Sequence, residues 1–136
     1  MKKFFSPKGW LIANGLIHGA MGCIVQLTMT DNAVEMSWGE AATAHDAMYE
    51  AIMGFMVLPP VVLMWVAAFA LVGKAQAQVS AALGASLTLA FLGIAAVSSG
   101  TGYMADMGTF DAFAPPMILS LGMLVSGMLH MNEAAS

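Results

Sequence analysis

The chain alternates between long apolar stretches and short polar ones. Four stretches contain no Asp, Glu, Lys or Arg, and they cover residues 9–30, 51–73, 79–100 and 112–131. Each is close to the ~20 residues that an α-helix needs to cross a hydrocarbon layer of ~30 Å. A helix on the surface of a soluble protein would show a polar face at helical spacing, and these stretches do not. The pattern therefore predicts four membrane-spanning helices.

The composition supports this interpretation. Hydrophobic residues make up 60% of the chain and charged residues only 9%, with a mean hydropathy of +0.81, whereas a soluble domain carries roughly 25% charged residues. Most soluble enzymes are thereby excluded, and four lysines are too few for a nucleic-acid-binding surface. We predict an all-α integral membrane protein, a four-helix bundle in which residues 1–136 form a single domain.

The charged residues divide into two groups that predict the orientation. Lys2, Lys3 and Lys8 precede the first span, and Lys74 lies between the second and third spans. Positively charged loops stay in the cytoplasm, so both termini are expected to face inward. Seven of the eight acidic residues then fall on the outer side: Asp31, Glu35, Glu40, Asp46, Glu50, Asp106 and Asp111.

Small residues at four-residue spacing predict where helices approach closely, within the bundle or between subunits. They are Gly15 and Gly19 in the first span, Ala82, Ser86 and Ala90 in the third, and Gly122 and Ser126 in the fourth. Pro59 and Pro60 lie in the middle of the second span, where the lost backbone donor predicts a kink.

The three histidines lie at different depths. His18 is about 18 Å below the outer end of its helix, His45 precedes the second span, and His130 ends the fourth. The depths of His18 and His45 argue against one metal ion shared by the histidines of a single subunit, and they leave single-histidine sites or sites shared between subunits. For His18 we expect a hydrogen bond to Asn14 or to a carbonyl of a neighbouring helix, although an ionisable residue inside a span is also a functional candidate. No span contains Asp, Glu, Lys or Arg, which disfavours ion-driven transport.

His45 has the most informative surroundings. Thr43 and Asp46 resemble a capping box, so a helix is expected to begin here. His45, Tyr49, Ile52 and Met56 then share one face of that helix. A neutral imidazole at the rim of an apolar slot can hold a haem iron, and the alternative is an ordinary interfacial histidine. The 14 methionines are expected to fill gaps in the packing, and the alternative is Cu(I) binding by their thioethers.

Several short motifs resemble those of one family. Trp38 precedes Ala44-His45, Leu58-Pro59 follows in the second helix, and the fourth span opens with Asp111 and Phe113. In these motifs and in its layout the chain resembles the styrene oxide isomerases, short bacterial membrane proteins with four helices and both termini inside.

The resemblance implies a multi-pass protein of the bacterial inner (plasma) membrane that binds haem b. His45 would ligate the iron, with Met48, Ile52 and Met56 beside the cofactor. Ferric haem would act as a Lewis acid in converting small hydrophobic epoxides to carbonyl compounds. The family has an Asn where this chain has Ala51, and its third-helix Tyr has no aligned match, so Tyr49 or Tyr103 would take the catalytic place of that residue.

Two other functions remain open. The chain could be a non-catalytic small subunit of a larger respiratory or oxygenase complex, with structural histidines. It could also handle copper on the outer face through Met and His. The expected partners are a small hydrophobic substrate, membrane lipid, and either further copies of the chain or a larger membrane complex.

Overall fold

The computed structural model describes residues 4–105 and 108–132, which form helices joined by turns, as the sequence predicts. The elements in chain order are α1 (Pro7–Gly19), the π-helix η1 (Ala20–Val25), α2 (Gln26–Thr28), α3 (Thr30–Trp38), the 3₁₀ helix η2 (Gly39–Ala41), α4 (Asp46–Ala70), α5 (Gly73–Ser98) and α6 (Thr109–His130).

Four helical segments are long and apolar enough to cross a membrane, and they coincide with the four predicted stretches. They are Pro7–Thr28, Asp46–Ala70, Gly73–Ser98 and Asp111–His130. The largest difference concerns α5, which begins at Gly73 rather than near residue 79. Helix α4 likewise begins earlier than its charge-free stretch, at Asp46 rather than near residue 51. The carboxylate of Asp46 accepts a hydrogen bond from the backbone N–H of Thr43, which is one of the two contacts of the predicted capping box, and the helix begins at Asp46, with His45 as its N-cap residue.

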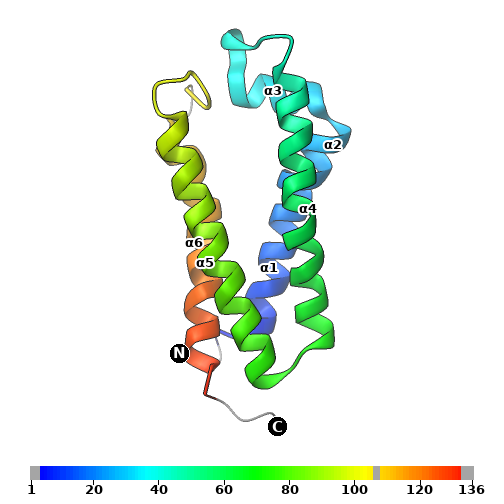
Figure 1. Cartoon of the computed structure of the whole chain (residues 1–136), viewed down its shortest axis with the longest axis vertical. Coiled ribbons are helices and arrows are strands. Elements are labelled where there is room, and N and C mark those ends of the chain that lie inside the picture. The colour runs from blue at the N-terminus through cyan, green and yellow to red at the C-terminus, as the bar shows by residue number, and fades with distance from the viewer. Residues whose placement is uncertain (1–3, 106–107, 133–136) are drawn as a thin grey trace.

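The long helices lie side by side as two pairs, α1 with α4 and α5 with α6 (Figure 1). The start of α1, the α4–α5 turn and the end of α6 lie at one end of the molecule, which we call the lysine end because it carries Lys8 and Lys74. At the opposite end are α3, η2, the start of α4 and the α5–α6 loop. We call it the carboxylate end, since it carries Asp31, Glu35, Glu40, Asp46, Glu50 and Asp111.

The α5–α6 pair is held together by direct contact between backbones. A Cβ added to Gly84 would lie 2.3 Å from the backbone nitrogen of Leu124, and one added to Gly127 would lie 2.4 Å from that of Ala81. Only glycine permits this approach, which brings the two helix backbones into van der Waals contact.

The stripe of small residues in the third span does not pack within the described chain, so a contact between subunits is the role that stays a prediction. Ala82, Ser86 and Ala90 are exposed, and α5 instead packs through the face that carries Ser80 and Gly84. The small residues of the predicted stripe have the correct spacing, but four-residue spacing recurs on several faces of an alanine-rich helix. Only the partner helix determines which of those faces is buried.

The first span behaves as the GxxxG pattern predicts. Gly15 lies against the indole of Trp65 and Gly19 against Val61, so both glycines face α4. The span then widens into the π-helix η1 before α2, a distortion that is frequent at functional sites. In the second span, α4 runs continuously from Asp46 to Ala70 through Pro59 and Pro60.

Candidate functional sites

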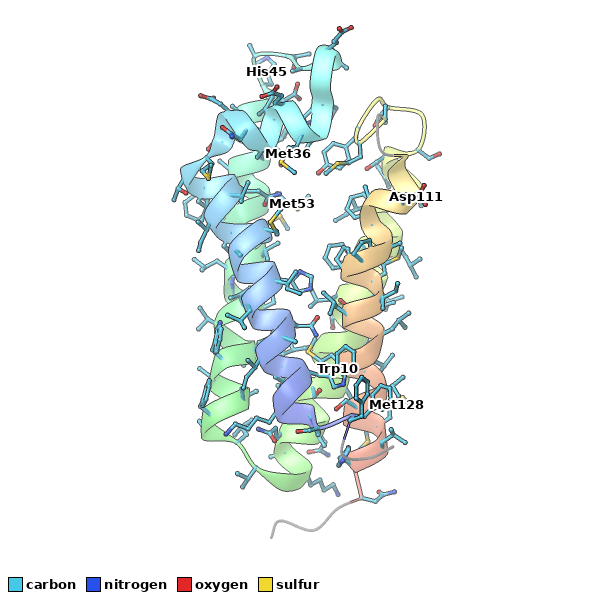
Figure 2. All side chains as sticks on the ribbon, turned by 180° about the vertical axis from the view of Figure 1, so that it is seen from behind. Trp10, Met36, His45, Met53, Asp111 and Met128 are labelled. Atoms are coloured by element: carbon cyan, nitrogen blue, oxygen red, sulfur yellow. The ribbon has the colours of Figure 1, made fainter. Side chains whose placement is uncertain are left out.

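His45 lies at the carboxylate end, where it is the N-cap residue of α4 (Figure 2). Its backbone carbonyl accepts hydrogen bonds from the N–H groups of Met48 and Tyr49, at 3.1 and 3.2 Å, whereas its side chain forms no capping hydrogen bond to the helix. The imidazole is exposed. A ring that is not used for capping is available to an external ligand.

The other residues predicted around a haem lie on the surface of α4. Met48, Tyr49, Ile52 and Met56 are each between 45% and 69% exposed. The helix therefore presents an apolar strip that continues from His45 toward the middle of the molecule, as the spacing predicts. Within residues 4–105 and 108–132, however, this strip forms one wall, and no opposite wall faces it.

The residues around His45 would suit a haem by their chemistry. An exposed imidazole next to an apolar surface offers the nitrogen that haem iron accepts and a surface against which a porphyrin edge can rest. The second wall of such a site would have to come from lipid or from another protein chain. No group of three or more His, Cys, Asp or Glu side chains in the described part of the chain is arranged to hold a metal ion.

Tyr49 and Tyr103, the two candidate catalytic tyrosines, lie in different surroundings. Tyr49 is 55% exposed on α4, whereas Tyr103, in the α5–α6 loop, is 9% exposed. The ring of Tyr103 packs edge-on against Trp38, with 4.9 Å between centroids, and stacks on Phe113 at 6.1 Å. The fold thus places only Tyr49 beside His45 on the exposed strip.

Glu50 forms the most highly connected polar cluster at the carboxylate end. One carboxylate oxygen accepts a hydrogen bond from Trp38 Nε1 at 3.1 Å, and the other accepts one from Gln26 Nε2 at 3.2 Å. The side chain of Ser37 is hydrogen-bonded to both Glu50 and Tyr103. Through these contacts Glu50 connects α2, α3 and α4 to the α5–α6 loop.

The position of Glu50 corrects the sequence-based prediction. We expected Glu50 on the outer side, just before the second span, but it belongs to the segment Asp46–Ala70 that is long enough to cross a membrane, and its side chain is only 2% exposed. The spacing of four residues places Glu50 on the same face of α4 as Asp46, but only the neighbouring elements determine that this face is buried.

The environment of Tyr103 also affects its ionisation. Burial raises the pKa of its phenol above the usual value of 10.0, and the nearby carboxylate of Glu50 raises it further, while the hydrogen bond with Ser37 acts in the opposite direction. The phenol therefore stays protonated at neutral pH and can act as a hydrogen-bond donor.

Aromatic rings continue from this cluster toward the middle of the molecule. Phe113 contacts Phe91 with 6.0 Å between centroids, and Phe91 stacks on the imidazole of His18 at 5.4 Å. The expected hydrogen bond between His18 and Asn14 is not formed. The Asn14 amide instead donates to the carbonyls of Trp10 and Leu119, and the buried His18 Nε2 has no hydrogen-bond partner among the residues that the structure describes.

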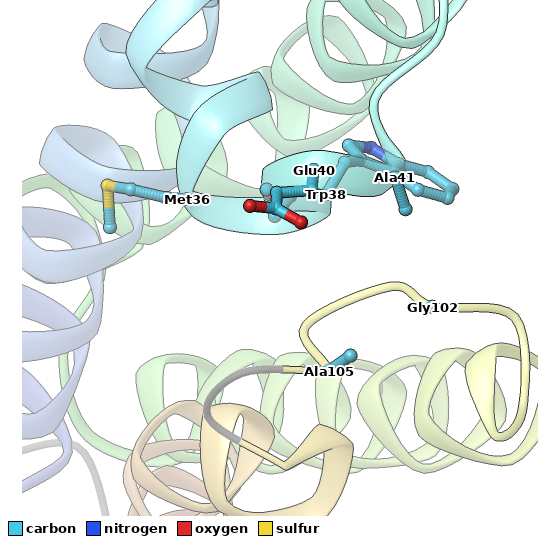
Figure 3. A pocket seen from close by; sticks show the side chains of 8 residues that line it. Met36, Trp38, Glu40, Ala41, Gly102 and Ala105 are labelled. Carbon is cyan, nitrogen blue, oxygen red and sulfur yellow. The ribbon is translucent and has the colours of Figure 1, made fainter.

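A cavity of about 490 Å³ lies next to the Glu50 cluster, between η2 and the α5–α6 loop (Figure 3). Its lining consists of Met36, Ser37, Trp38, Gly39, Glu40, Ala41, Gly102 and Ala105. The backbone N–H of Met104 donates a hydrogen bond to the carbonyl of Ser37, which joins the α5–α6 loop to α3 beside the cavity. Sequence reasoning did not identify this cavity, because it forms between segments about 60 residues apart in the chain.

Comparisons with protein-family models, with curated proteins and with solved structures found no match to this chain.

Proposed function

We propose that this chain is a haem b protein of the bacterial inner membrane that isomerises small hydrophobic epoxides to carbonyl compounds. One observation carries the proposal: His45 is exposed at the start of α4, the helix that presents an exposed apolar strip. The styrene oxide isomerases, which the chain resembles in its short motifs, suggest the cofactor and the reaction.

In this proposal each residue of the strip has a defined task. His45 would hold the iron, and Met48, Ile52 and Met56 would provide the apolar surface beside the porphyrin. Bound haem would supply a Lewis-acidic iron for the epoxide oxygen. Tyr49, one turn from His45, would place its phenol where it can orient a substrate oxygen. The reaction is an internal rearrangement in which a C–O bond breaks, a hydride shifts and a carbonyl forms.

The proposed orientation places the lysine end in the cytoplasm, and it rests on the positive-inside rule. The strip on α4 supplies one wall of a haem site. We therefore propose that a second copy of the chain or a subunit of a larger membrane complex supplies the other. A site shared with a larger complex also fits the alternative function, in which the chain is a non-catalytic subunit of that complex.

An absorption spectrum tests the proposal. The full chain, expressed with haem supplied and purified in detergent, should show a Soret band that His45→Ala removes. His130→Ala is the matched control, because His130 lies at the lysine end, where its ring interacts with the Ser126 carbonyl at 2.9 Å. Haem-loaded protein should convert styrene oxide to phenylacetaldehyde, and His45→Ala should not.

Two results would contradict the proposal in different ways. A preparation without a Soret band, or one whose band survives His45→Ala, would exclude His45 as the haem ligand. A Soret band that depends on His45, without turnover of the epoxide, would retain the haem site but favour the subunit over the isomerase.

A further inference from the structure

The cavity between η2 and the α5–α6 loop has the size of a ligand site. Its volume of about 490 Å³ falls within the range of about 300–1,000 Å³ that is typical of small-molecule pockets. Met36, Trp38 and Glu40 lie on one side of it and Gly102 and Ala105 on the other (Figure 3). None of the lining residues belongs to the exposed strip below His45, so this cavity is separate from the proposed haem site.

The charge around the cavity favours a cation. Glu40 is an exposed carboxylate in its lining, and the carboxylate end holds five further acidic residues of the described chain. The described lysines, Lys8 and Lys74, are both at the opposite end. A surface with one sign of charge raises the local concentration of ions of the opposite sign.

A second observation concerns Glu50, which lies behind the cavity wall and is hydrogen-bonded to Trp38. Buried carboxylates are normally paired with a cation. Every hydrogen-bond donor that residues 4–105 and 108–132 offer to Glu50 is uncharged, since the donors come from Gln26, Ser37 and Trp38. When it is ionised, this carboxylate therefore has no counter-ion in the described chain.

Trp38 connects the buried carboxylate with the cavity. Its indole lines the cavity, and its Nε1–H donates to Glu50 at 3.1 Å. Indole is the aromatic ring that binds cations best. Donation of the N–H to a carboxylate adds electron density to the ring and fixes its orientation, and both effects favour a cation at the ring face.

We propose that this cavity binds a small organic ammonium ion, with the ring of Trp38 as its aromatic wall and the carboxylates of Glu40 and Glu50 as the balancing charges. An ammonium ion with an apolar body matches the lining, which also includes Met36 and Ala41.

A matched pair of probes tests the role of charge. Choline and 3,3-dimethylbutan-1-ol have almost the same shape, but only choline is charged. Titration calorimetry on the full chain, in an uncharged maltoside detergent at low salt, should show saturable binding of choline. The neutral alcohol should bind at least roughly tenfold more weakly, as the strength of a desolvated cation–π contact implies.

Variants that remove one charge locate the site. Glu40→Gln and Glu50→Gln should each weaken choline binding roughly three- to tenfold, and Glu35→Gln is the control. Glu35 is an exposed acid on the same helix, α3, but it does not line the cavity. His45→Ala should leave choline affinity unchanged, so that failure of the haem proposal and failure of this one are distinguishable.

Several outcomes would overturn the proposal. Choline that fails to bind at millimolar concentration, or binds no better than the alcohol, would exclude an ammonium site. Equal losses in Glu35→Gln and Glu40→Gln would show that choline responds only to the diffuse charge of the surface. Circular dichroism of each variant checks that the fold is retained.

Discussion

The α5–α6 pair and the carboxylate end are built in opposite ways. In the α5–α6 pair, backbones touch at Gly84 and Gly127, and the hydroxyl of Ser80 donates to the carbonyl of Met123 at 2.9 Å. At the carboxylate end, long side chains connect the elements, around a buried carboxylate and beside a cavity. The first region gains rigidity from close backbone contact, and the second keeps groups that can bind a ligand.

The largest effect is expected in the α5–α6 pair. Gly84→Ala should lower the free energy of unfolding by about 3 kcal/mol, because the new methyl group would lie 2.3 Å from the backbone nitrogen of Leu124. Gly93→Ala on the same helix is the control, since no described atom lies within 4 Å of its added Cβ. The control should be neutral or stabilising by up to about 1 kcal/mol. Denaturant unfolding in detergent measures both, and equal effects would disprove tight packing at Gly84.

A smaller effect is expected from the polar cluster. Glu50→Ala should cost about 2 kcal/mol, because it leaves the Trp38 and Gln26 donors buried without their acceptor. Glu35→Ala removes an exposed acid from the same end and should change the stability by less than about 0.5 kcal/mol. If the two variants unfold at the same denaturant concentration, the cluster does not hold the carboxylate end together.

The next effect concerns His18 of α1, whose ring contacts the α5–α6 pair through Phe91. His18→Phe keeps a ring that can stack on Phe91 and removes the buried Nε2, which has no hydrogen-bond partner. We expect the variant to be about 1 kcal/mol more stable, since it avoids burying an unsatisfied polar atom. A loss of stability in the same unfolding assay would instead mean that water or a ligand satisfies Nε2 in the folded protein.

The smallest effect is the pH dependence that Tyr103 contributes. Its folded pKa lies above the usual 10.0, so the unfolded chain releases this proton first as the pH rises. The contribution of Tyr103 to stability is therefore complete below about pH 10 and is lost as the pH rises through the folded pKa. Tyr103→Phe should reduce the fall in thermal stability between about pH 9 and pH 11. If thermal stability falls equally in Tyr103→Phe and in the unchanged protein, other groups cause the fall.

Local sequence signals predicted the helices of this protein well and its contacts less well. The Thr43–Asp46 pair predicted the start of α4, and the Gly15–Gly19 pair predicted a close helix contact, because each signal acts within one or two turns. The stripe of Ala82, Ser86 and Ala90 did not predict a contact within the chain, because nothing in its own helix distinguishes a packed face from an exposed one.

The candidate sites divide in the same way. Helical spacing alone predicted that His45 and Ile52 share one face, and the structure shows both residues exposed, His45 as the N-cap of α4 and Ile52 on the helix. The sequence did not predict the Glu50 cluster, because the donors to Glu50 come from Gln26 and Trp38 on separate elements. Neither donor is within one helical turn of Glu50, so no local periodicity connects them.

The sequence by itself determined four long apolar helices and the separation of lysines from carboxylates at the two ends. Both properties follow from the identity and order of residues, since the transfer of apolar and charged groups from water depends little on their neighbours. Only the tertiary structure decided that Glu50 is buried, that Tyr103 contacts Trp38, and that η2 and the α5–α6 loop enclose a cavity. Those features depend on distances between separate elements, which are set by how closely the helix backbones can approach.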